Sequence, residues 1–259
     1  MARLAAADGT IVLACTPHFM PGVYDTSLAV VERAVEDLTA SFKERGINLG
    51  LVVGGDVHAA PNLVTRLNAG EVPTINGSRY FLLEPPHDVL PPRFEDLAFG
   101  LLSEGYVPIL THPERLKWIE SRYAVIRHLA DAGVLMQLTA GAVVGRFGRR
   151  PRYWSERMLD EGIVHFLATD AHNADRRPPD LSRGRDAVAA RFGDDFALDL
   201  VLHNPLLVLE DGEPSEIRSE SDRVVEDVRI ETAEKADKNE GPLGLGRLWP
   251  FRASERSRC

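Results

Sequence analysis

Cysteine is scarce in this sequence: Cys15 and Cys259 are the two examples among 259 residues. Two cysteines cannot build a disulfide framework or a zinc site made of thiolates. The first residues also lack the apolar core of a signal peptide, and no apolar run is long enough to span a bilayer. Together these absences predict a cytoplasmic protein that does not insert into a membrane.

Positive charge is also in short supply, because 30 Lys and Arg residues stand against 39 Asp and Glu residues. The formal net charge of −9 opposes binding to nucleic acid or to an anionic membrane, so the sequence predicts neither as a partner. A chain of 259 residues is long enough to bury one large core, and a closed α/β fold commonly uses about this length as one domain.

Short apolar runs that end in His, Asp or Glu recur along the chain. The run Val107–Leu110 leads directly to His112 and Glu114, and Pro113 prevents that strand from continuing. Similar runs occupy residues 11–18, 51–58, 80–85 and 165–172. Predicted helices alternate with these runs, which indicates a mostly parallel sheet or barrel wrapped by helices. Because reactive groups gather at the carboxyl ends of strands in such folds, we expect the polar ends to converge on one pocket.

The composition changes near residue 210. Residues 211–259 are rich in Glu, Arg, Ser, Asp and Lys, with few large apolar residues before the patch Leu248–Phe251. Such a segment buries too little apolar surface to offset the entropy of folding. The sequence therefore predicts one domain over residues 1–210 and a disordered, charged C-terminal tail over residues 211–259. We interpret the Leu-Trp-Pro-Phe patch as part of a solvated end rather than as a docking motif.

Four histidines and three carboxylates are expected to share the pocket: His18, Asp56, His58, Glu84, His112, Asp170 and His172. Imidazole and carboxylate ligands without thiolate suit manganese, iron or zinc in hydrolytic use, and carboxylates that bridge two cations suit a multinuclear site. Alternation along a strand end would turn Asp170 and His172 to the same side. The remaining histidines are interpreted as structural: His87, His128, His165 and His203.

Three arginines are candidates for binding a phosphate ester. Arg115 directly follows a strand end, and Arg177 lies in the loop after His172, so either planar guanidinium group could bind two phosphate oxygens. Arg146 belongs to a further basic loop, Gly145–Arg150, and is a candidate substrate contact. Surface solubility explains that loop about as well as substrate binding does.

Six motifs resemble, in order and spacing, the PHP-domain protein tyrosine phosphatases of bacterial capsule and exopolysaccharide biosynthesis. The resemblance covers essentially residues 1–210. The motifs are Thr16-Pro17-His18, Gly54–His58, Leu83-Glu84-Pro85, His112-Pro113-Glu114-Arg115, Gln137–Gly141 with Gly145–Gly148, and Asp170–Asn173.

This resemblance implies an α/β fold of the PHP type, a distorted (β/α)7 barrel with a manganese-favouring site for two or three Mn²⁺ ions. Members open with a strand that carries a His-x-His pair, and this chain starts after that point, so we expect the first barrel strand to be missing. Family members commonly have glutamate where Asp56 stands. By matching position, Arg115, Arg177 and Asp170 would be the catalytic residues, the two arginines holding the phosphate. The metal ligands would be His18, Asp56, Glu84, His112, Asp170 and His172.

The function implied is hydrolysis of phosphotyrosine on the tail of a partner tyrosine autokinase that regulates capsular or exopolysaccharide synthesis. Two alternatives stay open. A chain without the first ligand pair could be a catalytically impaired regulatory module that binds phosphate without turnover, or the same chemistry could act on a small phosphate ester such as histidinol phosphate. The sequence also leaves open whether apolar residues on the outer helices form a homo-oligomer interface.

Overall fold

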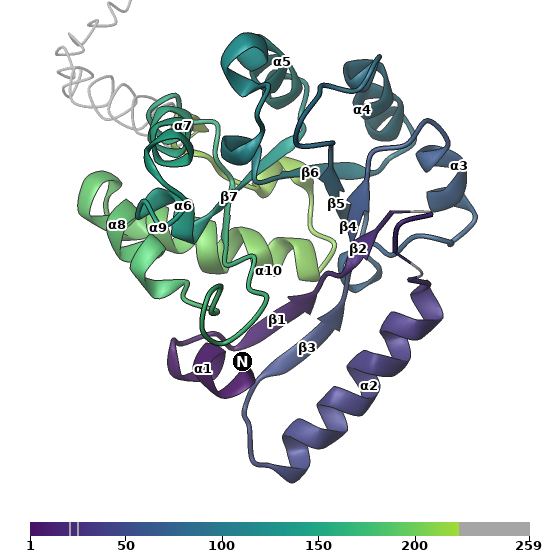
Figure 1. Cartoon of the computed structure of the whole chain (residues 1–259), viewed down its shortest axis with the longest axis vertical. Helices are drawn as coiled ribbons and strands as arrows, with labels where there is room; N and C mark the ends of the chain where they lie inside the picture. Colours follow the sequence, from purple (N-terminus) through teal and green to yellow (C-terminus); the bar gives the residue numbers. More distant parts are fainter. Residues whose placement is uncertain (21, 25, 223–259) are drawn as a thin grey trace, which may run out of the picture. The chain divides into compact units, whose positions relative to one another are not determined.

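The structure is a computed structural model that describes residues 1–20, 22–24 and 26–222. Within the compact unit Met1–Asp222, parallel strands alternate with helices (Figure 1). Strands β1 (Val12–Cys15) and β3 (Gly50–Val53) form a parallel pair. A second, six-stranded parallel sheet has the order β2 (His18–Phe19), β4 (Asp56–His58), β5 (Tyr80–Glu84), β6 (Val107–Thr111), β7 (Leu135–Thr139) and β8 (Phe166–Ala168).

Backbone hydrogen bonds continue from one sheet to the other, between the short segment that joins β1 to β2 and the short segment that joins β3 to β4. Gly54 donates its backbone N–H to the Cys15 carbonyl and Asp56 donates to the Pro17 carbonyl, each at 3.0 Å. Glycine is needed at position 55, between β3 and β4, because a Cβ there would lie 2.7 Å from the Phe19 ring. The backbone hydrogen bonds therefore bring the ends of β2 and β4 side by side, with His18 in register with Asp56.

Alternate residues of the central strands face two different cores. On β5, Phe81 and Leu83 pack into a large cluster shared with the helices, whereas Tyr80 and Leu82 pack into a smaller cluster on the other face. Figure 1 shows α3, α4 and α5 along the outer side of the sheet. The helices are α1 (Ala2–Ala7), α2 (Leu28–Glu44), α3 (Leu63–Asn68), α4 (Phe94–Ser103), α5 (Ile119–Asp131), α6 (Ala140–Val143), α7 (Arg149–Asp160), α8 (Ser182–Phe192), α9 (Asp194–Leu198) and α10 (Asn204–Leu209).

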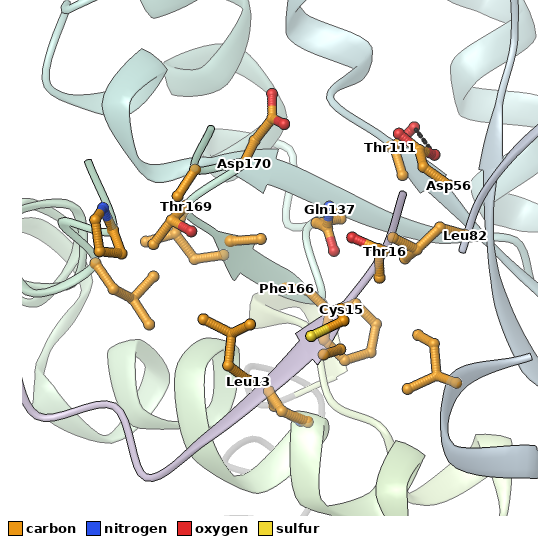
Figure 2. A pocket seen from close by; sticks show the side chains of 18 of the residues that line it. Leu13, Cys15, Thr16, Asp56, Leu82, Thr111, Gln137, Phe166, Thr169 and Asp170 are labelled. Carbon is orange, nitrogen blue, oxygen red and sulfur yellow. Dashed lines mark hydrogen bonds between the residues drawn. The ribbon is translucent and has the colours of Figure 1, made fainter. Parts of the chain in front are cut away.

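The described strands do not form a closed ring. β1 pairs with β3 and β8 pairs with β7, and neither has a second strand partner in the described part of the chain. Both strands line a pocket of about 590 Å³, with Leu13 and Cys15 on the β1 side and Phe166 and Thr169 on the β8 side (Figure 2). This arrangement is compatible with the predicted distorted (β/α)7 barrel. The missing first strand stays a prediction from the resemblance.

Residues 211–222 pack against the body and belong to the same compact unit as residues 1–210, and the domain boundary at residue 210 stays a prediction. The Tyr80 hydroxyl donates to the Gly212 carbonyl at 2.7 Å, and Arg79 donates its backbone N–H to the Asp211 carboxylate at 2.7 Å. Ile217 is 5% exposed. The amino-acid composition does not reveal this packing, because hydrogen bonds rather than apolar contacts hold most of the segment in place. The rest of the predicted tail, 223–259 with its Leu-Trp-Pro-Phe patch, lies outside the described residues.

No helix in the described ranges is long and apolar enough to cross a membrane.

Candidate metal and phosphate site

Four of the predicted ligands meet at neighbouring strand ends. His18 comes from β2, Asp56 from β4, Glu84 from the end of β5, and His112 directly follows β6. His18 Nδ1 lies 3.0 Å from Glu84 Oε2 and 3.7 Å from Asp56 Oδ2. His112 Nε2 lies 3.5 Å from Glu84 Oε1 and 3.9 Å from Asp56 Oδ2. Parallel pairing in register therefore builds the convergence that the strand-end pattern predicted.

The turn after β6 holds His112 in place. All five residues of β6 are buried, and His112 then adopts a left-handed conformation with φ of 37°, which is strained for a residue with a Cβ. His112 donates its backbone N–H to the Gln137 carbonyl at 2.9 Å. The fully buried Glu114 accepts the backbone N–H of Thr139 at 3.1 Å, and burial raises the pKa of Glu114 to about 7. Hydrogen bonds involving both His112 and Glu114 thus hold the turn against β7.

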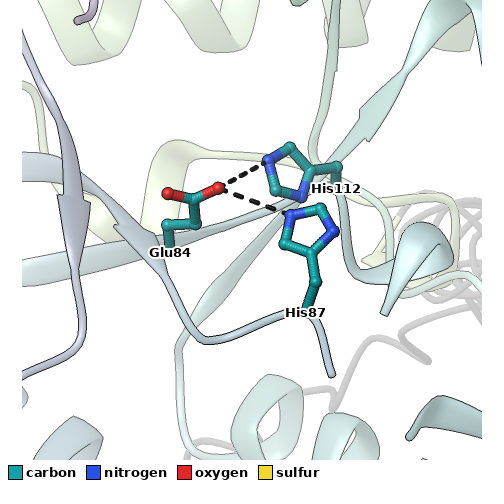
Figure 3. Close-up of side chains that lie close together, drawn as sticks. All are labelled: Glu84, His87 and His112. Carbon is teal, nitrogen blue, oxygen red and sulfur yellow. Dashed lines mark ion pairs between the residues drawn. The ribbon is translucent and has the colours of Figure 1, made fainter. Parts of the chain in front are cut away.

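His87 joins the site although the sequence analysis interpreted it as structural. Its Nε2 lies 3.4 Å from Glu84 Oε1, and its ring centroid lies 4.8 Å from that of His112 (Figure 3). The loop is fixed by Trp118, whose indole N–H donates to the Pro86 carbonyl at 3.0 Å. The available signal was the i,i+3 spacing from Glu84 across two prolines, which turns the chain back over the strand end.

Two overlapping sets of potential ligands result, and they share Glu84. One set is Glu84, His87 and His112, the other is His18, Asp56 and Glu84, and within each set the ligand atoms lie within 4.8 Å of one another. Glu84 Oε2 faces His18 and Glu84 Oε1 faces His87 and His112, and a carboxylate placed in this way between two sets is suited to bridging two divalent cations. His58 is in register with Glu84 but belongs to neither set.

The electrostatics of the cluster fit cations. Burial and then the neighbouring Glu84 raise the pKa of Asp56 to about 7, so a cation there would favour its ionised form. Burial opposes ionisation of Glu84, but hydrogen bonds with histidines, first His112, lower its pKa. Burial lowers the pKa of His112, which keeps the imidazole in the neutral, metal-binding form, and its buried Nδ1 has no hydrogen-bond partner among the described residues. The residues present therefore fit a metal centre.

Asp170 and His172, also predicted as ligands, lie outside both sets. Asp170 Oδ2 accepts hydrogen bonds from Arg115 and from Arg177, so the two predicted phosphate-binding arginines meet at one carboxylate. His172 Nδ1 lies 3.0 Å from the Asp170 carbonyl oxygen. Asp170 and Asp56 nevertheless line the same pocket, from different strand ends (Figure 2).

Arg146, the third predicted arginine, is not part of the pair that meets at Asp170. Its Nη2 lies 2.5 Å from Asp180 Oδ2. The structure therefore separates the three arginines into a convergent pair and a third that is held by another carboxylate.

The sequence matches the family described as "Capsular polysaccharide synthesis, CpsB/CapC" over residues 1–210, and the chain belongs to this family. It is 29% identical to the tyrosine-protein phosphatase YwqE of Bacillus subtilis over 208 residues, covering 80% of this chain and 82% of YwqE. It is 31% identical over 176 residues to the putative tyrosine-protein phosphatase CapC of Staphylococcus aureus, covering 68% and 69% of the two chains. These matches confirm the resemblance found in the motifs.

A solved structure supports the same relationship. It comes from crystallographic work on YwqE of Bacillus subtilis and CpsB of Streptococcus pneumoniae, described there as unique metal-dependent tyrosine phosphatases. The TM-score is 0.79 at 29% sequence identity, covering 82% of this chain and 86% of the other. The predicted α/β fold of the PHP type is confirmed by this match.

Proposed function

We propose that this chain is a metal-dependent protein tyrosine phosphatase that acts in capsular or exopolysaccharide synthesis. The observation that carries the proposal is the pair of ligand sets that share Glu84. Their members His18, Asp56 and His112 line the same pocket as Asp170, the carboxylate that Arg115 and Arg177 contact. The names of its relatives support phosphotyrosine as the substrate class.

Different residues of the chain would bind the metal ions and the phosphate group. His18, Asp56, Glu84, His112 and His87 would hold divalent cations, which we propose to be two or three Mn²⁺ ions. Such cations supply positive charge at the phosphoryl oxygens and activate water for attack on phosphorus. Arg115 and Arg177 present planar donor groups that bind phosphate oxygens in pairs. We propose that Asp170 is a catalytic residue that also orients both arginines, and that Asp170 and His172 are further metal ligands.

The substrate we propose is phosphotyrosine on the tail of a bacterial tyrosine autokinase. A cytoplasmic location, where such a tail would be reached, stays a prediction from cysteine usage. Neither nucleic acid nor a membrane is needed as a partner in this proposal, and the acidic balance of the chain disfavours both.

The test compares the full chain with His112→Ala after metal removal and stepwise return of Mn²⁺. Metal content is measured by mass spectrometry, and phosphate release from a phosphotyrosine peptide and from histidinol phosphate is followed. We expect Mn²⁺-dependent turnover that favours the peptide. His112→Ala should lose more than about 100-fold, because residues that merely orient metal ligands already cost about 10- to 100-fold.

The control is His128→Ala, which changes a surface histidine on α5 paired with Glu95 and should keep full activity. Full turnover in chelator, or in His112→Ala, would overturn the proposal. Tight binding of phosphopeptide with no turnover at any metal concentration would instead identify a binding module. A preference for histidinol phosphate would identify a small-ester phosphatase.

A further inference from the structure

Arg115 and Arg177 converge on a single carboxylate oxygen. Both donate to Asp170 Oδ2, and the side chains of the two arginines are 18% and 26% exposed. Two guanidinium groups so close together repel each other. Asp170 offsets that repulsion, but it does so by occupying N–H donors that a phosphate group would need. A second contact that leaves those donors free would therefore be useful.

Phe147 supplies such a contact. Its ring centroid lies 5.0 Å from the Arg115 guanidinium carbon and 5.9 Å from that of Arg177. Both distances fall within the range of about 6 Å over which an aromatic ring attracts a cation. The ring attracts the guanidinium groups through its π electrons and accepts no hydrogen bond from their edges, so the N–H donors stay available.

The loop after α6 is shaped to deliver this ring. Gly145 and Gly148 on either side of it have φ values of +79° and +94°, which favour glycine. Arg146 donates its backbone N–H to the Gly141 carbonyl at 2.8 Å, which folds the loop back on α6. A Cβ on Gly141 would lie 2.9 Å from Phe147 Cε2, so glycine at position 141 makes room for the ring.

We propose that Phe147 is a positioning residue, and that its ring holds Arg115 and Arg177 together in the arrangement that binds the phosphate group. This inference rests on the proposed function for the identity of the ligand. In this structure Asp170 and the ring contact the two arginines together; when a phosphate group displaces Asp170, the ring contact would remain, because it does not use the N–H donors. The same geometry assigns a role to Gly141, whose missing side chain is the space in which the ring lies.

The test uses inorganic phosphate, which has no ring that could stack on Phe147 directly. Phosphate is titrated calorimetrically into the Mn²⁺-loaded full chain and into Phe147→Leu, Phe147→Tyr and Gly141→Ala. Loss of the ring in Phe147→Leu should raise the dissociation constant about 3- to 10-fold, whereas Phe147→Tyr, which keeps the ring, should stay within about 2-fold. Gly141→Ala should weaken binding in the same direction, because the added methyl group displaces the ring.

Kinetics give a second measurement on the same variants. In Phe147→Leu the KM for an aryl phosphate should rise by the same factor as the phosphate dissociation constant, with kcat within about 2-fold, because the arginine contacts are present before and during phosphoryl transfer. Phe99→Leu is the matched control: it makes the same chemical change on α4, where Phe99 is 40% exposed, and should alter neither value.

Unchanged phosphate affinity in folded Phe147→Leu or folded Gly141→Ala would overturn the proposal, and so would absence of phosphate binding by the unsubstituted chain. If Phe147→Leu does not fold, Gly141→Ala, which retains the ring, decides alone. The two proposals fail separately. If Phe147→Leu weakens phosphate binding but the unsubstituted chain shows no turnover, the proposed phosphatase function fails and the role of Phe147 stands. If the unsubstituted chain shows turnover but Phe147→Leu binds phosphate with unaltered affinity, the phosphatase function stands and the role of Phe147 fails.

Discussion

Asp8 makes a long-range contact that should contribute measurably to stability. It follows α1, and its carboxylate accepts the backbone N–H groups of Leu181 and Ser182 at 2.7 and 3.0 Å and the Ser182 hydroxyl at 2.6 Å. Helix α8 begins at Ser182, and Leu181 before it has no side chain able to cap. A residue 173 positions earlier therefore supplies the N-cap.

We expect Asp8→Ala to lower the free energy of unfolding by about 2–3 kcal/mol. Removing a side-chain N-cap costs about 0.5–2 kcal/mol, and a hydrogen bond to a charged group contributes about 1.5–3 kcal/mol. These values overlap because they describe the same contacts, so they are not summed. Asp8→Asn keeps one acceptor oxygen and should lose about half as much.

The assay is urea unfolding of the full chain with linear extrapolation, supported by thermal unfolding. For a chain of this size the expected loss corresponds to a Tm about 4–12 °C lower. Asp37→Ala, an exposed carboxylate on α2, is the control and should change the free energy of unfolding by less than about 0.5 kcal/mol. An equally small effect of Asp8→Ala would refute the capping argument.

Two further predictions concern stability. His165 Nδ1 accepts the backbone N–H of Met136 at 3.1 Å, and burial lowers the pKa of His165 to about 4 from its ordinary value near 6.5. The unfolded chain therefore binds more protons than the folded chain between these two pH values, so stability falls as pH falls from about 6.5 to about 4. His165→Gln should make this loss of stability smaller when urea unfolding is compared at about pH 7 and about pH 5. The same pH dependence in both proteins would contradict this. Gly184→Ala should lower stability by about 1–3 kcal/mol, because its Cβ would lie 2.6 Å from the Cβ of Ala140; an unaltered Tm would show that α6 and α8 can separate without cost.

The part of the site that could be predicted from sequence follows from strand chemistry. A buried run that ends at a proline, as at Pro113, shows where a strand stops, and parallel neighbours in register put successive stops at one edge. His18, Glu84 and His112 are therefore found from the pattern alone. No knowledge of loop conformation is needed for these three.

The residues that sequence missed depend on contacts between distant segments. His87 reaches Glu84 because two prolines and the Trp118 indole fix its loop. The Asp8 cap joins segments 173 positions apart. Neither interaction leaves a periodic signal, because each depends on how loops fold over the sheet rather than on which face of a strand or helix is apolar.

Asp170 shows where the alternation argument stops being valid. The prediction that Asp170 and His172 point to the same side assumed a strand through residue 172, but β8 ends at Ala168 and Asp170 has a φ of +48°. Side chains beyond residue 168 therefore no longer alternate between the two faces of a strand, and the Asp170 carboxylate contacts Arg115 and Arg177. One carboxylate cannot fully satisfy two guanidinium groups and a cation at once, so any cation that Asp170 binds weakens its hold on the arginines. Under the proposed function that competition favours phosphate, which takes over the released N–H donors while the ring of Phe147 keeps the two arginines together.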